Sequence, residues 1–89
     1  MIRILKYPLS IVDKQTISLP ECAEILTVQT QQEMPFIWVI INTDNKTTEE
    51  KEIYTHGTGH EIEDVDSKKY LGTYQINGAA LVFHVFIGI

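Results

Sequence analysis

Cysteine is nearly absent from this chain of 89 residues, in which Cys22 is the only one. A single cysteine excludes an internal disulfide, so the fold is not held together in the way that small secreted domains are. No apolar run approaches the roughly 18 residues that a membrane-spanning helix needs. The segment Met1–Lys6 lacks the long apolar core and the small-residue cleavage site of a signal peptide. We therefore expect a cytoplasmic protein that makes no contact with a membrane.

Basic residues are also scarce: seven Lys and Arg stand against twelve Asp and Glu, and the formal charge is −5. This sign is unfavourable for binding a polymeric nucleic acid, which depends on neutralising many phosphates. A small anionic ligand is not excluded, because a few backbone amides and one Lys or Arg can hold a phosphate in an acidic protein. We therefore expect that the protein can bind a small anionic ligand, that it does not bind a polymeric nucleic acid, and that it uses no cofactor.

Apolar residues alternate with polar ones or form short blocks between turn residues, which is typical of strands. The pattern predicts one all-β domain over residues 1–89: a small antiparallel sheet or sandwich, or a partly open barrel, with at most a short helix. The predicted strands are Ile2–Tyr7, Gln15–Leu19, Ile25–Gln31, Phe36–Ile41, Glu52–His56, Tyr70–Ile76 and Ala79–Ile87. Asn42–Glu50 is predicted to be an exposed loop, in which Lys46–Lys51 could form a short helical turn. Asp64–Lys69 is predicted to be a second loop.

The dipeptide Asn77-Gly78 lies between two β-like runs and is the preferred sequence of a two-residue type I′ hairpin turn. Such a turn would pair Gln75 with Ala80 and Tyr74 with Leu81. The face expected to be core would carry Tyr70, Tyr74, Ile76, Leu81, Phe83 and Val85. The opposite face would carry Thr73, Gln75 and His84 among Leu71, Val82 and Phe86. A face of this mixed character is expected to form a ligand groove or a subunit interface.

Two of the predicted strands carry apolar residues on both faces, Leu81–Ile87 and, nearly so, Phe36–Ile41. Such strands normally need a covering layer on each side, and they aggregate when they are exposed. A chain this short with little helix cannot supply both layers. We therefore expect a homo-oligomer, either a dimer or a tetramer.

The segment Tyr54–His60 holds two of the three histidines and suggests a metal site. Its two glycines disfavour the helix that would place His56 and His60 on one face. On a straight strand the histidines would be roughly 13 Å apart at about 3.3 Å per residue, which is too far for one ion. A glycine turn could bring them together, with Glu61 or Glu63 as a third ligand, but the spacing matches no zinc pattern. We expect no metal.

His56-Gly57-Thr58 matches one half of the paired His-x-Thr elements of two-histidine phosphoesterases, which need a general base and a general acid. Neither His60 nor His84 is followed by a hydroxyl residue at that spacing, so the second half is missing. Gly57-Thr58-Gly59 also lacks the Lys-Ser/Thr ending of a phosphate loop. Cys22 has no signature of a nucleophile and is expected to be a small buried thiol. The sequence therefore predicts no enzyme.

Several motifs stand in order along almost the whole chain: Lys6-Tyr7-Pro8-Leu9, Ile25-Leu26-Thr27-Val28-Gln29, Trp38, Gly57-Thr58-Gly59-His60, Tyr70-Leu71-Gly72-Thr73-Tyr74-Gln75 and Gly78–Phe86. Together they resemble a family of small phage-encoded proteins. The resemblance implies an immune-evasion sponge, which sequesters a cyclic nucleotide signal such as cyclic GMP–AMP in the host cytoplasm and so blunts bacterial CBASS defence. A structural or protein-interaction module of a phage, such as a virion component or a host-protein inhibitor, is the alternative.

Residue chemistry indicates how such a ligand could be held. Backbone amides of Gly57-Thr58-Gly59 could bind phosphate, with Lys68 nearby as a cation. Tyr70, Tyr74 or Trp38 could stack on a base, and Gln75 or Gln29 could read the edge of a base. The predicted ligand-binding residues are His56, Gly57, Thr58, Gly59, His60, Lys68, Tyr70, Thr73, Gln75 and Trp38.

Overall fold

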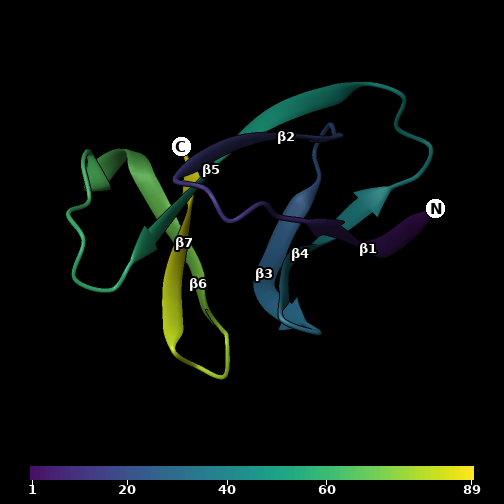
Figure 1. Ribbon diagram of the computed structural model, residues 1–89. Coiled ribbons are helices and arrows are strands. Elements are labelled where there is room, and N and C mark those ends of the chain that lie inside the picture. The colour runs from purple at the N-terminus through teal and green to yellow at the C-terminus, as the bar shows by residue number, and fades with distance from the viewer.

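The computed structural model describes all 89 residues and contains seven strands in two antiparallel sheets (Figure 1). The strands are β1 (Ile2–Pro8), β2 (Lys14–Pro20), β3 (Glu24–Gln31), β4 (Met34–Asn42), β5 (Thr48–Gly57), β6 (Lys68–Ile76) and β7 (Leu81–Gly88). A three-stranded sheet has the order β1-β4-β3, and a four-stranded sheet has the order β2-β5-β7-β6. In Figure 1 the hairpin of β6 and β7 lies to the left and β1, β3 and β4 lie to the right. The prediction of an all-β fold is confirmed.

Helix is limited to one short element, the 3-10 turn η1 (Val65–Ser67), which precedes β6. The structure contains no helix with the length and apolarity that crossing a bilayer would require. The prediction of at most one short helix is confirmed by η1.

One hydrophobic core joins the two sheets and consists of ten buried apolar side chains. Ile37 and Val39 of β4 are fully buried, and so are Ile53 of β5 and Val85 of β7. These residues recur at every second position because successive side chains of a strand point to opposite faces. Full burial of a side chain of this size contributes about 1.5–3 kcal/mol, so this layer is the main source of stability.

Gly72 of β6 lets the two sheets approach each other. A Cβ atom at this position would lie only 2.8 Å from Cγ1 of Val28, a buried residue of β3. Real Cβ contacts are longer than this, so the side-chain hydrogen of glycine is what allows β6 to pack on β3. The glycine also sits beside an irregularity of register between Tyr70 and Gly72.

The strand β5 begins earlier than the sequence suggested. It starts at Thr48, and Thr48 pairs with Pro20 of β2. The predicted helical turn at Lys46–Lys51 is therefore wrong, and the loop predicted at Asn42–Glu50 is confined to residues 43–47. The reason is pairing with β2, which supplies backbone partners to a polar segment whose own apolar pattern is too weak to indicate a strand.

The β6–β7 hairpin has a longer loop than the predicted two-residue turn. Ile76 pairs with Leu81, so residues 77–80 form a four-residue loop, in which Asn77, Gly78 and Ala79 all have positive φ. The backbone N–H of Asn77 donates to the Glu33 carboxylate at 2.6 Å. The predicted pairs are therefore wrong by two residues. A shift of two preserves the faces, so Tyr74, Ile76 and Val85 are buried as expected.

Two residues of the predicted core face are exposed for local reasons. Tyr70 pairs with Phe86 while Gly72 pairs with Val85, and this bulge moves Tyr70 to the opposite face, where it is 55% exposed. Leu81 is exposed because it lies at the hairpin end, next to the loop. The second predicted loop also ends early, since Lys68 and Lys69 belong to β6.

Cys22 is exposed, which corrects the prediction of a buried thiol. It occupies the tight turn between β2 and β3 with a φ of 66°, and the turn is closed by a hydrogen bond from the Ala23 N–H to the Pro20 carbonyl. A residue at the tip of such a turn projects into solvent whatever its polarity.

Candidate functional site

The outer face of the four-stranded sheet carries a row of aromatic rings. Strand register places Lys14 of β2 beside Tyr54 of β5, Tyr54 beside Phe86 of β7, and Phe86 beside Tyr70 of β6. The ring centroids of Tyr70 and Phe86 are 5.5 Å apart with an interplanar angle of 65°. The His56 ring meets Phe86 at 5.8 Å and 72°. These edge-to-face contacts fix the rings and leave a half-exposed aromatic surface.

A second row on the same face is polar and centres on His84. The Nε2 atom of His84 lies 2.7 Å from the Thr58 hydroxyl, and its Nδ1 atom lies 2.9 Å from the Thr73 hydroxyl. The Tyr70 hydroxyl is 2.5 Å from that of Thr73. We call Thr58, His84, Thr73 and Tyr70 the His84 chain. Both ring nitrogens of His84 are thus occupied by hydroxyl groups, and none by a carboxylate.

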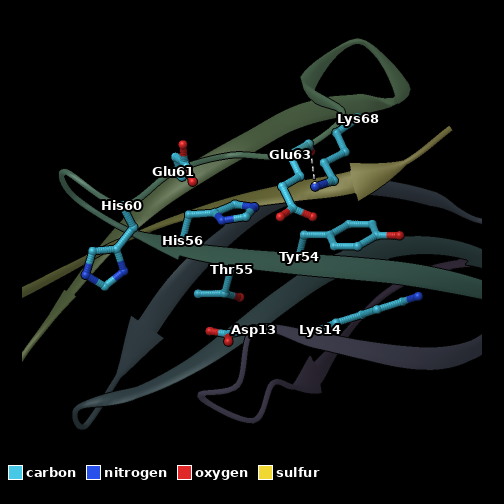
Figure 2. A pocket seen from close by; sticks show the side chains of 9 residues that line it. All are labelled: Asp13, Lys14, Tyr54, Thr55, His56, His60, Glu61, Glu63 and Lys68. Carbon is cyan, nitrogen blue, oxygen red and sulfur yellow. Dashed lines mark hydrogen bonds between the residues drawn. The ribbon is translucent and has the colours of Figure 1, made fainter.

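A hollow of about 300 Å³ opens beside this face, next to the first residue of β2, Lys14. Beyond the pair of Lys14 and Tyr54, β5 continues without β2 beside it. Figure 2 shows the residues that line it: Asp13, Lys14, Tyr54, Thr55, His56, His60, Glu61, Glu63 and Lys68. Tyr54, His56 and Lys68 lie on one side of β5 in this view, and Thr55 and Asp13 lie on the other. We call this cavity the Tyr54 hollow.

The ring of Tyr54 is held between charged groups. The ammonium of Lys68 lies 4.4 Å from the ring centroid and that of Lys14 lies 5.6 Å from it. The Tyr54 hydroxyl donates to the Glu52 carboxylate at 2.5 Å. This hydrogen bond raises the pKa of Tyr54 and lowers the pKa of Glu52. Tyr54 therefore stays protonated and presents a neutral ring that attracts cations on its face.

The surroundings of His56 disfavour its charged form. Burial lowers its pKa below the ordinary value, and the positive charge of Lys68 lowers it further. Its Nε2 atom is buried without a hydrogen-bond partner. A buried polar atom that is left unpaired in this way costs about 1–3 kcal/mol of stability.

The loop Gly57–His60 makes its close contacts with other atoms of the protein. A Cβ atom on Gly57 would lie 3.0 Å from Cε1 of His60, so the glycine makes room for the imidazole of His60. The backbone N–H of His60 donates to the Gly57 carbonyl and that of Thr58 donates to the Val82 carbonyl. Two of the backbone amides in this loop are therefore already bonded within the protein, which weakens its predicted role as a phosphate cradle.

The family model described as a domain of unknown function, DUF7352, matches residues 1–89. The chain belongs to this family. Comparisons with curated proteins and with solved structures give no match. A function for this DUF7352 chain is therefore inferred from the chemistry of its own surface.

The structure brings together most of the residues that the sequence singled out. His56, His60 and Lys68 line the Tyr54 hollow, and Thr58, Thr73 and Tyr70 belong to the His84 chain. Gly57 and Gly59 shape the loop between these two groups, and Gly59 has a φ of 89°.

Two predicted site residues of the DUF7352 chain lie elsewhere. Gln75 is farther along β6, outside the Tyr54 hollow, in a second depression that it shares with Thr73 of the His84 chain and with Gln29 of β3. Trp38 belongs to the three-stranded sheet, where the ammonium of Lys6 lies 5.9 Å from its ring. The structure therefore does not join Trp38 to the other predicted residues.

The sequence missed Lys14 and Tyr54 as members of the site. Both occupy outward positions of their strands, and their pairing follows from the register of β2 with β5. The sequence did indicate that a charged residue and an aromatic residue lie at outward strand positions. It could not show that the two are neighbours, because 40 residues separate them.

A joint metal site of His56 and His60 finds no support in the geometry. The two rings point in different directions in Figure 2. No group of three or more His, Cys, Asp or Glu side chains in the structure is placed to hold a metal ion.

Proposed function

We propose that this protein binds and sequesters a small anionic nucleotide without cleaving it, as the viral sponges that its sequence resembles do with cyclic GMP–AMP. One observation carries the proposal. The outer face of the four-stranded sheet combines a row of aromatic rings with two lysines and a line of hydroxyl and imidazole groups. These are the groups that stack on bases, offset phosphate charge and bond to base edges.

The size of the face suits a compact ligand. Tyr54 and Tyr70 stand on strands separated only by β7, so their backbones are about 10 Å apart at roughly 4.8 Å per strand. A cyclic dinucleotide has two bases held by a small ring of two phosphates. One base can stack near Tyr54 while the other reaches Tyr70, and the phosphates then lie where Lys14 or Lys68 can contact them.

Binding without cleavage is favoured by the state of the histidines. General acid–base cleavage needs one group that accepts a proton and one that donates it. His84 is bonded to two hydroxyl groups and lacks the carboxylate that would orient and strengthen it as a base. His56 has its pKa lowered by burial, so it is poorly suited to act as an acid. The two histidines are therefore better suited to binding the nucleotide than to cleaving it.

The acidic side chains limit which anions can enter. Asp13, Glu61 and Glu63 line the same hollow as Lys14 and Lys68, and the Lys68 ammonium donates to the Glu63 carbonyl at 2.5 Å. A phosphate would therefore meet three carboxylates in the hollow, and the Glu52 carboxylate, 3.7 Å from the Lys14 ammonium, already pairs with one of the two lysines. This arrangement disfavours free phosphate and favours a ligand whose bases supply much of the binding energy.

The proposal is tested by thermal unfolding with cyclic GMP–AMP and a panel of other cyclic nucleotides. We expect one of them to raise the melting temperature and to be recovered intact, by mass spectrometry, after the complex is heated. Tyr54→Leu and Lys68→Ala should each weaken the shift. Lys46→Ala, which removes an exposed lysine of the β4–β5 loop, should leave it unchanged. No shift with any member of the panel at high excess contradicts sequestration, and recovery of a cleaved product contradicts binding without cleavage.

A further inference from the structure

Strand β1 forms an outer edge of the three-stranded sheet, and β4 is the only strand that pairs with it. The Thr43 N–H donates to the Met1 carbonyl at 2.8 Å, and the Leu9 N–H donates to the Pro35 carbonyl at 3.0 Å. Both bonds continue the register of β1 with β4. Because bonded and non-bonded pairs alternate in an antiparallel ladder, the odd-numbered residues of β1 bond to β4. The residues that turn their backbone groups to the free edge are Ile2, Ile4, Lys6 and Pro8, the last without an N–H.

This free edge lacks the charged cover that edge strands normally have. A lysine on an edge strand keeps other strands away when its charge projects from the edge. The Lys6 ammonium instead lies 4.7 Å from the centroid of the Phe36 ring and 2.5 Å from Oε1 of Gln31. Gln31 belongs to β3, on the far side of β4, so the lysine side chain crosses the sheet away from the free edge. Apolar side chains remain at the edge, since Ile2 and Ile4 are 66% and 60% exposed.

We propose that β1 pairs antiparallel with β1 of a second copy of this chain, so that the two three-stranded sheets become one continuous sheet. The pairing is centred on Leu5. Ile4 of each copy then exchanges backbone hydrogen bonds with Lys6 of the other, and the Ile2 N–H donates to the Pro8 carbonyl. Every free N–H group of the edge thereby obtains an acceptor. Pro8 lies at the end of the ladder, where its missing N–H leaves only the Ile2 carbonyl to water.

The side chains of β1 select a second β1 as the partner. Leu5 lies opposite Leu5 of the second copy in a pair without backbone bonds, where side chains come closest. Leu5 is 39% exposed and pairs with Val39, which is fully buried, so the two leucines extend the core of each copy across the edge. Arg3 lies opposite Tyr7 of the second copy, whose ring attracts a cation. Centring the pairing on Arg3 or Lys6 would instead set like charges directly opposite each other, which is unfavourable. The charges therefore restrict the register to the apolar middle of the strand.

The remaining strands offer no comparable edge. The two apolar strands that led to the prediction of an oligomer, β4 and β7, each lie between two other strands. The edges β3 and β6 pack against each other. On the other outer edge, β2, the bonds from the Thr55 N–H to the Asp13 carbonyl and from the Glu21 N–H to the Thr47 carbonyl show that odd-numbered residues bond to β5. The free groups of β2 belong to Lys14, Thr16, Ser18 and Pro20. That edge is polar, so β1 is the apolar free edge of the chain.

The dimer does not depend on the proposed ligand, because the Tyr54 hollow and the His84 chain belong to the four-stranded sheet. Backbone bonds that replace bonds to water each contribute little, so sedimentation velocity should show a dimer that dissociates on dilution. Over the same concentration range, amide hydrogen exchange measured by NMR should become slow at Ile4 and Lys6 as the dimer forms. At Leu5 and Tyr7, whose amides bond to β4, it should be slow at every concentration.

Ile4→Pro is the decisive variant. Proline removes the N–H that Ile4 turns to the free edge, and the single chain loses no backbone bond by this change. We expect a monomer at concentrations where the wild type is a dimer. The matched control is Thr16→Pro, which removes an N–H from the same kind of position on β2 and should leave the dimer intact. Far-UV circular dichroism should show the wild-type fold for both variants.

Three results would overturn the proposal. One is a wild-type protein that is monomeric at every concentration, and another is a dimer in which exchange at Ile4 and Lys6 stays fast. The third is an Ile4→Pro protein that dimerises like the wild type. If Ile4→Pro alters the fold, the exchange pattern of the wild type decides by itself. Ile4→Pro should keep the nucleotide-dependent thermal shift of the wild type, so failure of dimerisation and failure of nucleotide binding are separate results.

Discussion

Adding one methyl group at Gly72 should separate the two sheets. In Gly72→Ala the new Cβ atom would lie 2.8 Å from Cγ1 of Val28, which is fully enclosed in the core. Overpacking of this kind destabilises by about 1–3 kcal/mol. The substitution also restricts the unfolded chain, which returns about 0.4–1 kcal/mol. The clash is the larger effect, so we expect a net loss of about 1–2 kcal/mol in the free energy of unfolding.

The assay is equilibrium urea unfolding at one fixed protein concentration, with a double-mutant cycle. Val28→Ala alone creates a cavity and should destabilise by about 2 kcal/mol. It also removes the atom with which the new methyl group collides. The double variant should therefore be more stable than the sum of the single changes predicts, by about 1–2 kcal/mol of coupling energy.

Gly88→Ala is the matched control on the neighbouring strand. A Cβ atom there would lie 3.3 Å from the Cβ of Glu52 and 3.3 Å from Cε2 of Tyr54, contacts that a small shift can relieve. Its effect should be close to zero. If Gly72→Ala is neutral or stabilising, or if the cycle is additive, then β6 and β3 are not in the close contact described and the reasoning fails.

Three further predictions concern the site. Glu63→Gln should strengthen nucleotide binding several-fold by removing a carboxylate from the Tyr54 hollow; titration calorimetry should show this gain, whereas Glu50→Gln, on an exposed position of β5, should show none. Thr73→Val removes one partner of His84, so binding should weaken while the far-UV circular dichroism stays that of the wild type; unchanged affinity would argue against a role for the His84 chain. The pKa of His56 is lower in the folded than in the unfolded protein, so the unfolded state binds more protons and stability should fall as the pH drops below the ordinary value of about 6.5. His56→Gln should make the pH dependence of urea unfolding shallower between neutral pH and pH 5, and identical slopes would refute this assignment.

Local patterns were sufficient to predict the fold class and the approximate position of every strand. Apolar patterning is a property of the strand itself, so β4 and β7 could be identified from their short, nearly continuous apolar runs. The hairpin register could not, because Asn77-Gly78 favours a two-residue turn locally while the structure extends the loop to Ala80. The bulge that exposes Tyr70 likewise depends on the packing of Gly72 against another strand.

The site was less predictable than the fold because its contacts join distant segments. Thr58, Thr73 and Tyr70 were selected for their chemistry. The structure joins them through His84, which bonds to Thr58 and Thr73, while Tyr70 bonds to Thr73; the strand order places His84 beside His56. Trp38 was grouped with them on chemistry alone. The order of strands in the two sheets separates it from them, and sequence patterns do not specify that order.

The His84 chain has a consequence for how the site selects its ligand. A neutral imidazole donates from one nitrogen and accepts at the other, so the chain has two complete proton arrangements. In one, Tyr70 donates to Thr73, Thr73 to Nδ1, and Nε2 to Thr58, which leaves the Thr58 hydrogen free. In the other, every bond is reversed and the Tyr70 hydrogen is free. The distances fit either arrangement.

A ligand that places an acceptor at Thr58 therefore turns Tyr70 into an acceptor, with no movement of a heavy atom. Thr58 and Tyr70, the two ends of the His84 chain, lie on opposite sides of β7. When one of them donates its free hydrogen to the ligand, the other can only accept. A ligand with a donor at one end and an acceptor at the other is favoured in either orientation. A ligand that presents acceptors at both ends is not, because only one hydroxyl hydrogen is free in each arrangement.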